Sequence, residues 1–220
     1  MKHRLDEVEA KLKSTDKDHD AARRETRDAK ERFEEVRKQR VNLFNTAFNH
    51  ISERIDHVYK DLTKGKAAPM GGVAYLSLED SEVRFESLFR RNWLTAAQEP
   101  YLHGVKYHAM PPMKRFRDME QLSGGEKTMA ALALLFAIHS FKPSPFFVLD
   151  EVDAALDNTN VGRIANYIRS KSSEKFQFVV ISLKGAFYEK ANGLVGIWRD
   201  IERNSSSTLT LDLDKFGAEA

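Results

Sequence analysis

The sequence contains no cysteine, so a disulfide framework and thiolate metal ligands are both excluded. No apolar run approaches the length that spans a membrane, and the first residues, MKHRLDEVEAKL, lack the apolar core of a secretory signal. The net charge of +2 over 220 residues gives no argument for nucleic-acid binding. These absences predict a soluble intracellular protein with no membrane partner.

Motifs that bind phosphate or perform acyl transfer are also missing. No stretch fits the P-loop pattern G-x-x-x-x-G-K-[ST]; Lys127 and the threonine after it imitate its end, but Glu126 stands where a glycine belongs. No G-x-S-x-G elbow occurs. Lys114, Arg115 and Arg117 form a small basic cluster, which is more typical of a solvated face than of a DNA site.

Charge dominates the beginning of the chain, where 24 of the first 40 residues are Asp, Glu, Lys or Arg. That density excludes a packed core there. Apolar residues nevertheless recur at alternating spacings of three and four, which is typical of a coiled-coil seam. The clearest seam positions are Leu5, Val8, Leu12, Phe33, Val36 and Leu43.

A solvated single helix is the alternative interpretation of this segment. A helix of this length needs a partner to bury even a narrow stripe, so we favour the coiled coil. A second seam of larger side chains, displaced by one position, begins at Phe44 and ends at Leu62. We therefore predict a coiled-coil helix over residues 1–62 that leads into a globular domain over 63–220.

After the glycine- and proline-containing run 64–72, strand and helix patterns alternate. The strand patterns cover residues 73–78, 105–109, 146–149 and 176–182, with a terminal hairpin over 194–199 and 208–213. The helix patterns cover 126–141, which is apolar nearly all round and is expected to be buried, and 161–170. Fully apolar strands between helices predict a layered α/β domain.

Residues 82–99 depart from this organisation, with aromatic and leucine residues at helical spacing between two strand patterns. The residues before and after them could join directly. We interpret the stretch as a surface insertion or a translated intron, which the transcript sequence would distinguish. Because Met1 begins within the seam, we also expect the chain to be a piece of a longer protein.

The segment Ser123-Gly124-Gly125-Glu126 has the pattern of a capping box at a helix start. A helix N-terminus also presents free N–H groups and a positive dipole end to a phosphate, and two glycines allow the backbone a close approach. The structural and the functional interpretation require the same geometry.

The segment 146–151 is an apolar strand that ends in two carboxylates, Asp150 and Glu151. The carboxyl end of a buried parallel strand is where α/β sheets bind ligands. Asp150 could hold Mg²⁺ through water, and Glu151 could orient and deprotonate an attacking water. A strand ending in a polar turn is the alternative. Asp157, further along, suggests either a helix cap or a loop that crosses a nucleotide.

Segments 106–116, 118–161 and 178–184 resemble structural maintenance of chromosomes (SMC) proteins, and the likeness extends over roughly 41–81 and 100–215. It is closest to the cohesin subunits of that family. The resemblance implies an ABC-type, RecF-like ATPase head that both ends of a long chain form together at the end of an antiparallel coiled coil. This chain resembles the C-terminal lobe of such a head.

The resemblance also implies roles for individual residues. The signature motif, which contacts the ATP held by the opposite head, corresponds to Leu122, Ser123, Gly124, Gly125 and Glu126. Asp150 corresponds to the Mg²⁺-binding Walker-B Asp, Glu151 to the catalytic Glu and Asp157 to the D-loop Asp. The switch position corresponds to Ser182, Leu183 and Lys184; many ABC ATPases have a His where Leu183 stands, so we assign no His-switch role.

The implied cofactors are ATP and Mg²⁺. The implied partners are the N-terminal half-head of the same protein, a second SMC subunit, DNA and a kleisin winged-helix domain bound at the terminal hairpin. The implied function is sister chromatid cohesion and chromosome organisation in the nucleus. Without a P-loop, the isolated chain is expected to be inactive as an ATPase.

Two alternatives remain open at this point. The chain could be a non-catalytic coiled-coil and kleisin-binding module. It could also belong to a Rad50-like repair ATPase, which would carry a Cys-x-x-Cys zinc hook in a further stretch of coil.

Overall fold

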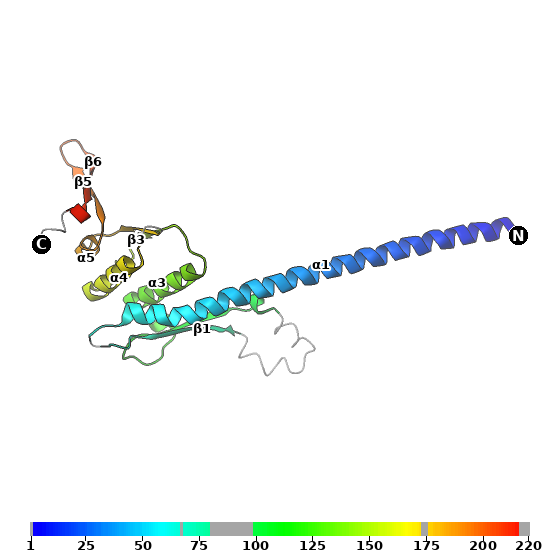
Figure 1. Cartoon of the computed structure of the whole chain (residues 1–220), viewed down its shortest axis with the longest axis horizontal. Helices are drawn as coiled ribbons and strands as arrows, with labels where there is room; N and C mark the ends of the chain where they lie inside the picture. Colours follow the sequence, from blue (N-terminus) through cyan, green and yellow to red (C-terminus); the bar gives the residue numbers. More distant parts are fainter. Residues whose placement is uncertain (1, 67, 80–98, 173–175, 216–220) are drawn as a thin grey trace. The chain divides into compact units, whose positions relative to one another are not determined.

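The structure is a computed structural model that describes residues 2–66, 68–79, 99–172 and 176–215 (Figure 1). The chain forms two compact units, one of residues 1–48 and 78–104 and one of residues 49–77 and 105–220. Apart from Glu99, the insertion predicted over 82–99 lies outside the described residues.

Helix α1 (Lys2–Thr63) confirms the long helix predicted from the seam. The apolar seam residues of its first part are between 55% and 70% exposed; they are Leu5, Val8, Leu12, Phe33, Val36 and Leu43. Within the same unit, Arg37 pairs with Glu99 at 3.1 Å and the Arg40 guanidinium lies 4.1 Å from the centre of the Tyr101 ring. The division into coil and head stays a prediction, because it depends on a partner helix.

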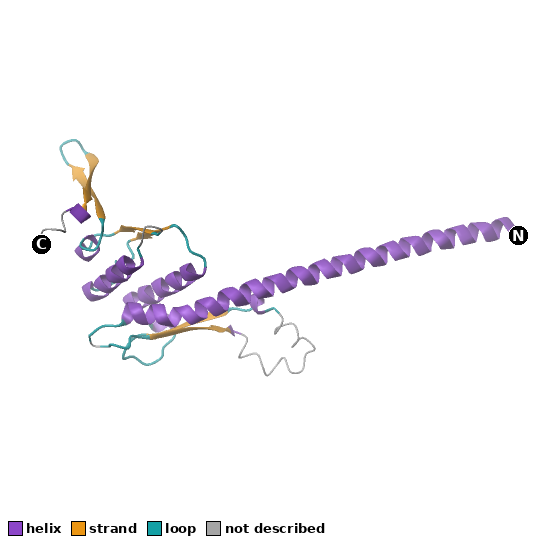
Figure 2. Ribbon diagram, in the orientation of Figure 1, coloured by secondary structure: helices purple, strands orange, loops and turns teal. Residues whose placement is uncertain are grey.

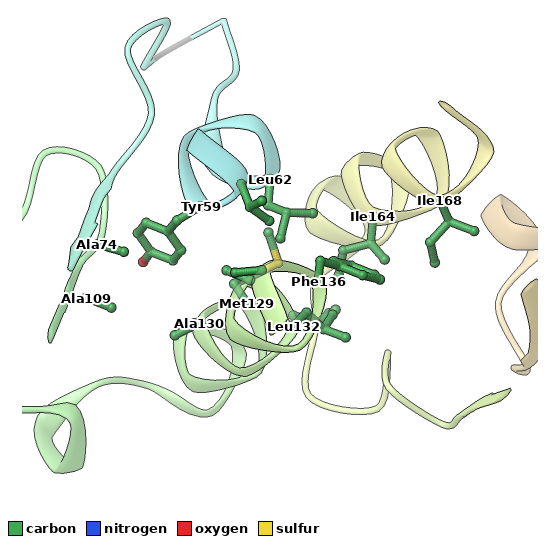
Figure 3. Close-up of a cluster of buried hydrophobic side chains, with 14 of the residues drawn as sticks. Tyr59, Leu62, Ala74, Ala109, Met129, Ala130, Leu132, Phe136, Ile164 and Ile168 are labelled. Atoms are coloured by element: carbon green, nitrogen blue, oxygen red, sulfur yellow. The ribbon is translucent and has the colours of Figure 1, made fainter. Parts of the chain in front are cut away.

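The core of the second unit forms where the last turns of α1 meet α3 (Gly124–Phe141) and α4 (Asn158–Lys171). Figure 3 shows Leu62 of α1, Met129 of α3 and Ile164 of α4 within one cluster of buried side chains. The Tyr59 ring extends from the same helix toward Ala74 and Ala109. The prediction that the second seam packs against bulky elements is confirmed for its last residues, since Ile55, Val58 and Leu62 are buried.

The strands form three pairs among the described residues (Figure 2). Strand β1 (Val73–Leu78) pairs with β2 (Val105–Met110), β3 (Phe146–Asp150) pairs in parallel with β4 (Gln177–Ile181), and β5 (Gly193–Asp200) forms an antiparallel hairpin with β6 (Ser205–Asp212). The short helices are η4 (Pro100–Leu102), η5 (Met119–Gln121), α5 (Gly185–Tyr188) and η6 (Leu213–Lys215). All six predicted strands are therefore present, with ends displaced by at most three residues, the largest shift being the start of β6.

The β3–β4 pair is buried on one face only. Phe147, Leu149, Phe178 and Val180 belong to or pack against the core, and the Phe136 ring of α3 lies within 6.4 Å of the Phe147 ring. The alternate residues on the other face are 41% to 56% exposed; they are Phe146, Val148, Val179 and Ile181. The prediction of fully buried strands is thus wrong for this chain alone, because an apolar run indicates a need for cover on both faces without indicating what supplies it.

Helix α3 departs from its prediction in the same way. Its buried residues include Met129, Leu132 and Phe136, but Ile138 and Phe141 are exposed. No described helix of the chain is both long and apolar enough to cross a membrane.

Replacing Leu62 by Ala should lower the free energy of unfolding by about 3 kcal/mol, because it opens a cavity between α1, α3 and α4. Leu43→Ala is the matched control on the same helix, and in the isolated chain it should change the free energy by less than about 0.5 kcal/mol. Urea-induced unfolding followed by circular dichroism measures both. Equal losses in the two variants would contradict the position of the core.

Candidate functional site

The capping box predicted at residues 123–126 is present at the N-terminus of α3. The Ser123 Oγ accepts from the Glu126 amide at 3.4 Å, and the Glu126 Oε2 accepts from the Ser123 amide at 3.0 Å. The other carboxylate oxygen of Glu126, Oε1, lies 2.6 Å from the Lys114 ammonium. Both oxygens of Glu126 are therefore engaged, and Lys114 has a partner that the sequence interpretation of a solvated basic cluster missed.

The pKa of Glu126 reflects this arrangement. Partial burial alone would raise the pKa, but the hydrogen bonds from Lys114 and Ser123 outweigh it and hold the pKa below its ordinary value. Glu126 is consequently ionised at neutral pH and fixes the first turn of α3.

The N-terminus of α3 packs against the loop that follows β3. A Cβ at Gly125 would lie 2.9 Å from the Ala155 carbonyl oxygen, so a larger residue would force the two segments apart. A Cβ at Gly124 would meet only the Ala155 Cβ, at an ordinary 3.6 Å. Packing against Ala155 thus explains why residue 125 is a glycine. It does not explain the glycine at position 124. Leu122, just before the helix, is buried.

Asp150 and Glu151 lie at the carboxyl end of β3, as predicted, and both are exposed. The Glu151 amide donates to the Ile181 carbonyl oxygen at 3.0 Å, which continues the parallel pairing past the end of the strand. Glu151 has a φ of +47°, in the left-handed region that a residue with a side chain rarely adopts. Such backbone strain persists where the surrounding structure imposes it and clusters at functional sites.

Asp157 caps α4, where its side chain accepts from the Asn160 amide at 3.3 Å. This bears out the helix-cap interpretation, and the role across a nucleotide stays a prediction. At the switch position after β4, Leu183 is 90% exposed while Ser182 and Lys184 on either side are partly buried and hydrogen-bonded to the β3 side.

The structure therefore brings the three predicted segments together through one loop, residues 151–157, which we call the β3 loop. It follows Asp150, contacts Gly125 and receives hydrogen bonds from Ser182 and Lys184. Sequence reasoning missed Asp153 as a site residue, although an acidic residue in a short loop that becomes only 4% exposed needs a polar partner.

No cluster of three or more His, Cys, Asp or Glu side chains occurs within the described ranges. A dedicated all-protein metal cage is therefore not formed by these residues. Mg²⁺ commonly binds through one or two carboxylates together with water and substrate phosphates. The exposed Asp150 carboxylate fits that kind of site.

Comparison with known proteins identifies the family. Residues 3–206 match the family described as RecF/RecN/SMC N terminal domain, and the chain belongs to this family. The chain has the α/β fold of SMC ATPase heads.

Among curated proteins, the chain is 58% identical over 213 residues to Structural maintenance of chromosomes protein 1 of Schizosaccharomyces pombe, covering 97% of this chain and 16% of that protein. It is 46% identical over 216 residues to the protein of the same name in Saccharomyces cerevisiae, again covering 97% and 16%. Structural maintenance of chromosomes protein 4 of Saccharomyces cerevisiae also matches, at 39% identity over 182 residues, covering 83% and 11%. The chain spans about one sixth of the length of its protein 1 relatives.

Two solved structures extend the comparison. One belongs to work on ATP-driven dimerization and DNA-stimulated activation of SMC ATPases; it has a TM-score of 0.61 at 32% identity and covers 80% of this chain and 91% of that chain. The other is the Pyrococcus furiosus Smc head with an extended coiled coil, bound to the C-terminal domain of ScpA. It has a TM-score of 0.67 at 33% identity and covers 84% of this chain and 40% of that chain.

The lowered pKa of Glu126 predicts a pH-dependent contribution to stability. A carboxyl group with a depressed pKa in the folded state stabilises it above its unfolded pKa, about 4.3, and this contribution is lost as the pH falls through the folded pKa. Glu126→Gln should therefore be less stable than the wild type by about 1 kcal/mol at pH 7. The difference should narrow as the pH falls below the unfolded pKa and vanish once the pH lies below the folded pKa of Glu126.

Urea titrations at a series of pH values from neutral downward measure this difference, and the exposed Glu53→Gln on α1 is the control. A stability gap between wild type and Glu126→Gln that stays constant with pH would contradict the assigned cause.

Proposed function

We propose that this chain is the half of an SMC head that supplies the signature motif and the Walker-B carboxylates, and that it acts in ATP hydrolysis within a complete pair of heads. The observation that carries the proposal is the position of Asp150 and Glu151. Asp150 is the last residue of a parallel strand and Glu151 follows it, and the loop that they begin packs against the N-terminus of α3 at Gly125.

The assignment to the C-terminal half rests on the sequence, since the description of the matching family names an N-terminal domain. A signature segment precedes the acidic pair, and no P-loop pattern occurs anywhere in the chain. The uncovered face of the β3–β4 pair supports the same proposal, because parallel sheets are normally covered on both faces. The proposed cover for Phe146, Val148, Val179 and Ile181 is the N-terminal half-head of the same protein.

Each proposed role follows from where the group lies. Asp150 would hold Mg²⁺, directly or through water, and the bound ATP would supply the phosphates that complete its coordination. The exposed Glu151 carboxylate would orient and deprotonate a water molecule. Ser123 and the free amides of the first turn of α3 would bind the phosphate presented by an opposite head. Asp157, which caps α4, would lie across that same interface.

The wider assembly is proposed from the relatives. The partner head would be a second SMC subunit of the protein 3 type, and the exposed α1 seam would pair with a helix from the other half of the same protein. The complex would act as cohesin on DNA in the nucleus, holding sister chromatids. DNA affinity that falls steeply with salt would test the contact with DNA.

Glu151→Gln, in heads completed with the N-terminal half and kleisin, should lower ATP turnover by about 100-fold or more, because the variant cannot accept the proton of the attacking water. ATP-dependent engagement of the heads should persist. Steady-state phosphate release and size-exclusion chromatography with ATP measure the two effects. Glu189→Gln, an exposed position at the end of α5, serves as the control. Unchanged turnover in Glu151→Gln would refute the assignment.

A docking role for the β5–β6 hairpin is a second proposal. Its strands expose apolar side chains on both faces, among them Val195, Ile197, Trp198 and Leu209. A solved SmcHead structure is described as bound to the C-terminal winged-helix domain of ScpA. We therefore propose that the hairpin binds the winged-helix domain of a kleisin.

Ile197→Glu should weaken binding of the kleisin C-terminal domain by about tenfold or more, since it places a charge at the centre of an apolar contact. Calorimetric titration measures the affinity. Leu102→Glu, an equally drastic change at an exposed residue outside the hairpin, should leave the affinity unaltered. Equal affinities for Ile197→Glu and wild type would remove the hairpin from the interface.

A further inference from the structure

Lys184 is the third residue after the end of β4 at Ile181, and its side chain reaches the β3 loop. Its ammonium donates to the Asp153 carbonyl oxygen at 3.0 Å and to the Leu156 carbonyl oxygen at 2.6 Å. The two acceptors belong to one tight turn, in which the Leu156 amide donates to that same Asp153 oxygen at 3.0 Å. A single side chain therefore holds both ends of the turn.

The carboxylate of Asp153 completes the connection. It is only 4% exposed, and its Oδ2 accepts from the Ser182 hydroxyl at 2.8 Å. The same hydroxyl oxygen accepts from the Lys184 amide at 3.0 Å, and the Tyr188 hydroxyl donates to the Ser182 carbonyl oxygen. A buried carboxylate is costly without hydrogen-bond partners, so the burial of Asp153 depends on its bond from Ser182. We call Lys184, Ser182 and Asp153 the Lys184 clamp.

The loop held by the clamp touches every proposed functional segment. Glu151 begins it, with its strained backbone bonded to Ile181. Ala155, in the middle, lies against Gly125 of the signature segment. Asp157 ends it and caps α4. A displacement of the clamp would therefore move the proposed catalytic carboxylate and the contact with the signature segment together.

We propose that Lys184 is a positioning residue that couples the segment after β4 to the proposed catalytic Glu151 and to the signature motif. The side chain at the position of the missing switch histidine, Leu183, points into solvent at 90% exposure, so the residue next to it makes the connection instead. Lys184 touches no reacting atom and acts by fixing the path of the β3 loop. The inference rests on the proposed ATPase function.

A packing role alone would also place a lysine at this point, so the test needs a readout that packing does not change. A small displacement of a catalytic group from its productive position lowers kcat more than it changes substrate binding. In completed, kleisin-bound heads, Lys184→Met should lower kcat for ATP hydrolysis by about tenfold while KM changes by less than about twofold. Lys184→Arg, which retains a donor on a long side chain, should recover at least about half of the activity.

Lys190→Met, at an exposed lysine just after α5, is the matched control and should behave as wild type. The inference is overturned if Lys184→Met keeps its kcat. It is also overturned if kcat, KM and Tm all deteriorate together and Lys184→Arg recovers none of them. Should Lys184→Met not fold, Ser182→Ala removes only the hydroxyl bound to Asp153 and should lower kcat by about threefold at constant KM, with an unchanged kcat overturning the inference.

Measuring Glu151→Gln in parallel distinguishes a failure of the proposed function from a failure of the Lys184 clamp. If Glu151→Gln hydrolyses ATP normally, the proposed function fails. If Glu151→Gln is inactive and Lys184→Met is normal, the proposed function stands and only the clamp fails.

Discussion

The pairing of β3 with β4 is the interaction on which the remaining structure depends. It brings together two loops that are about thirty residues apart in the sequence, and its extension from the Glu151 amide to the Ile181 carbonyl oxygen fixes where those loops begin. One face of the pair packs on α3, where the rings of Phe147 and Phe178 contact Phe136, and the other exposes a row of apolar side chains. Parallel sheets are normally covered on both faces, so the exposed row leaves one face of the pair open to a further layer.

Several polar side chains lie near the carboxyl edge of this pair, and each is held there by short-range hydrogen bonds. Ser123 and Glu126 close the start of α3, Asp157 starts α4, and Lys184 binds the loop between them. Each contact has a structural explanation of its own, yet together they hold the loop that follows two exposed carboxylates against the N-terminus of α3. No packing contact among the described residues explains the left-handed backbone of Glu151. Glu151 is also the residue to which the resemblance assigns catalysis, and backbone strain of this kind clusters at functional sites.

Much of the fold could be predicted because its signals are local. The capping box needs only the residues from Ser123 to Glu126, and the long helix needs only its spacing and the lack of breakers. The burial of each strand face could not be predicted, because an apolar run does not indicate which element covers each of its two faces. The contacts of Lys114 with Glu126 and of Lys184 with Asp153 were missed, since a lysine in a loop gives no indication of its distant partner.

The central claim is that these residues form half of a nucleotide site, and a nucleotide titration tests it most directly. ATP with Mg²⁺ would be titrated calorimetrically into the isolated 220-residue chain and into the same chain assembled with the N-terminal half of the protein. The account predicts no micromolar binding to the isolated chain and micromolar binding to the assembled head. Micromolar binding of ATP by the isolated chain would contradict it.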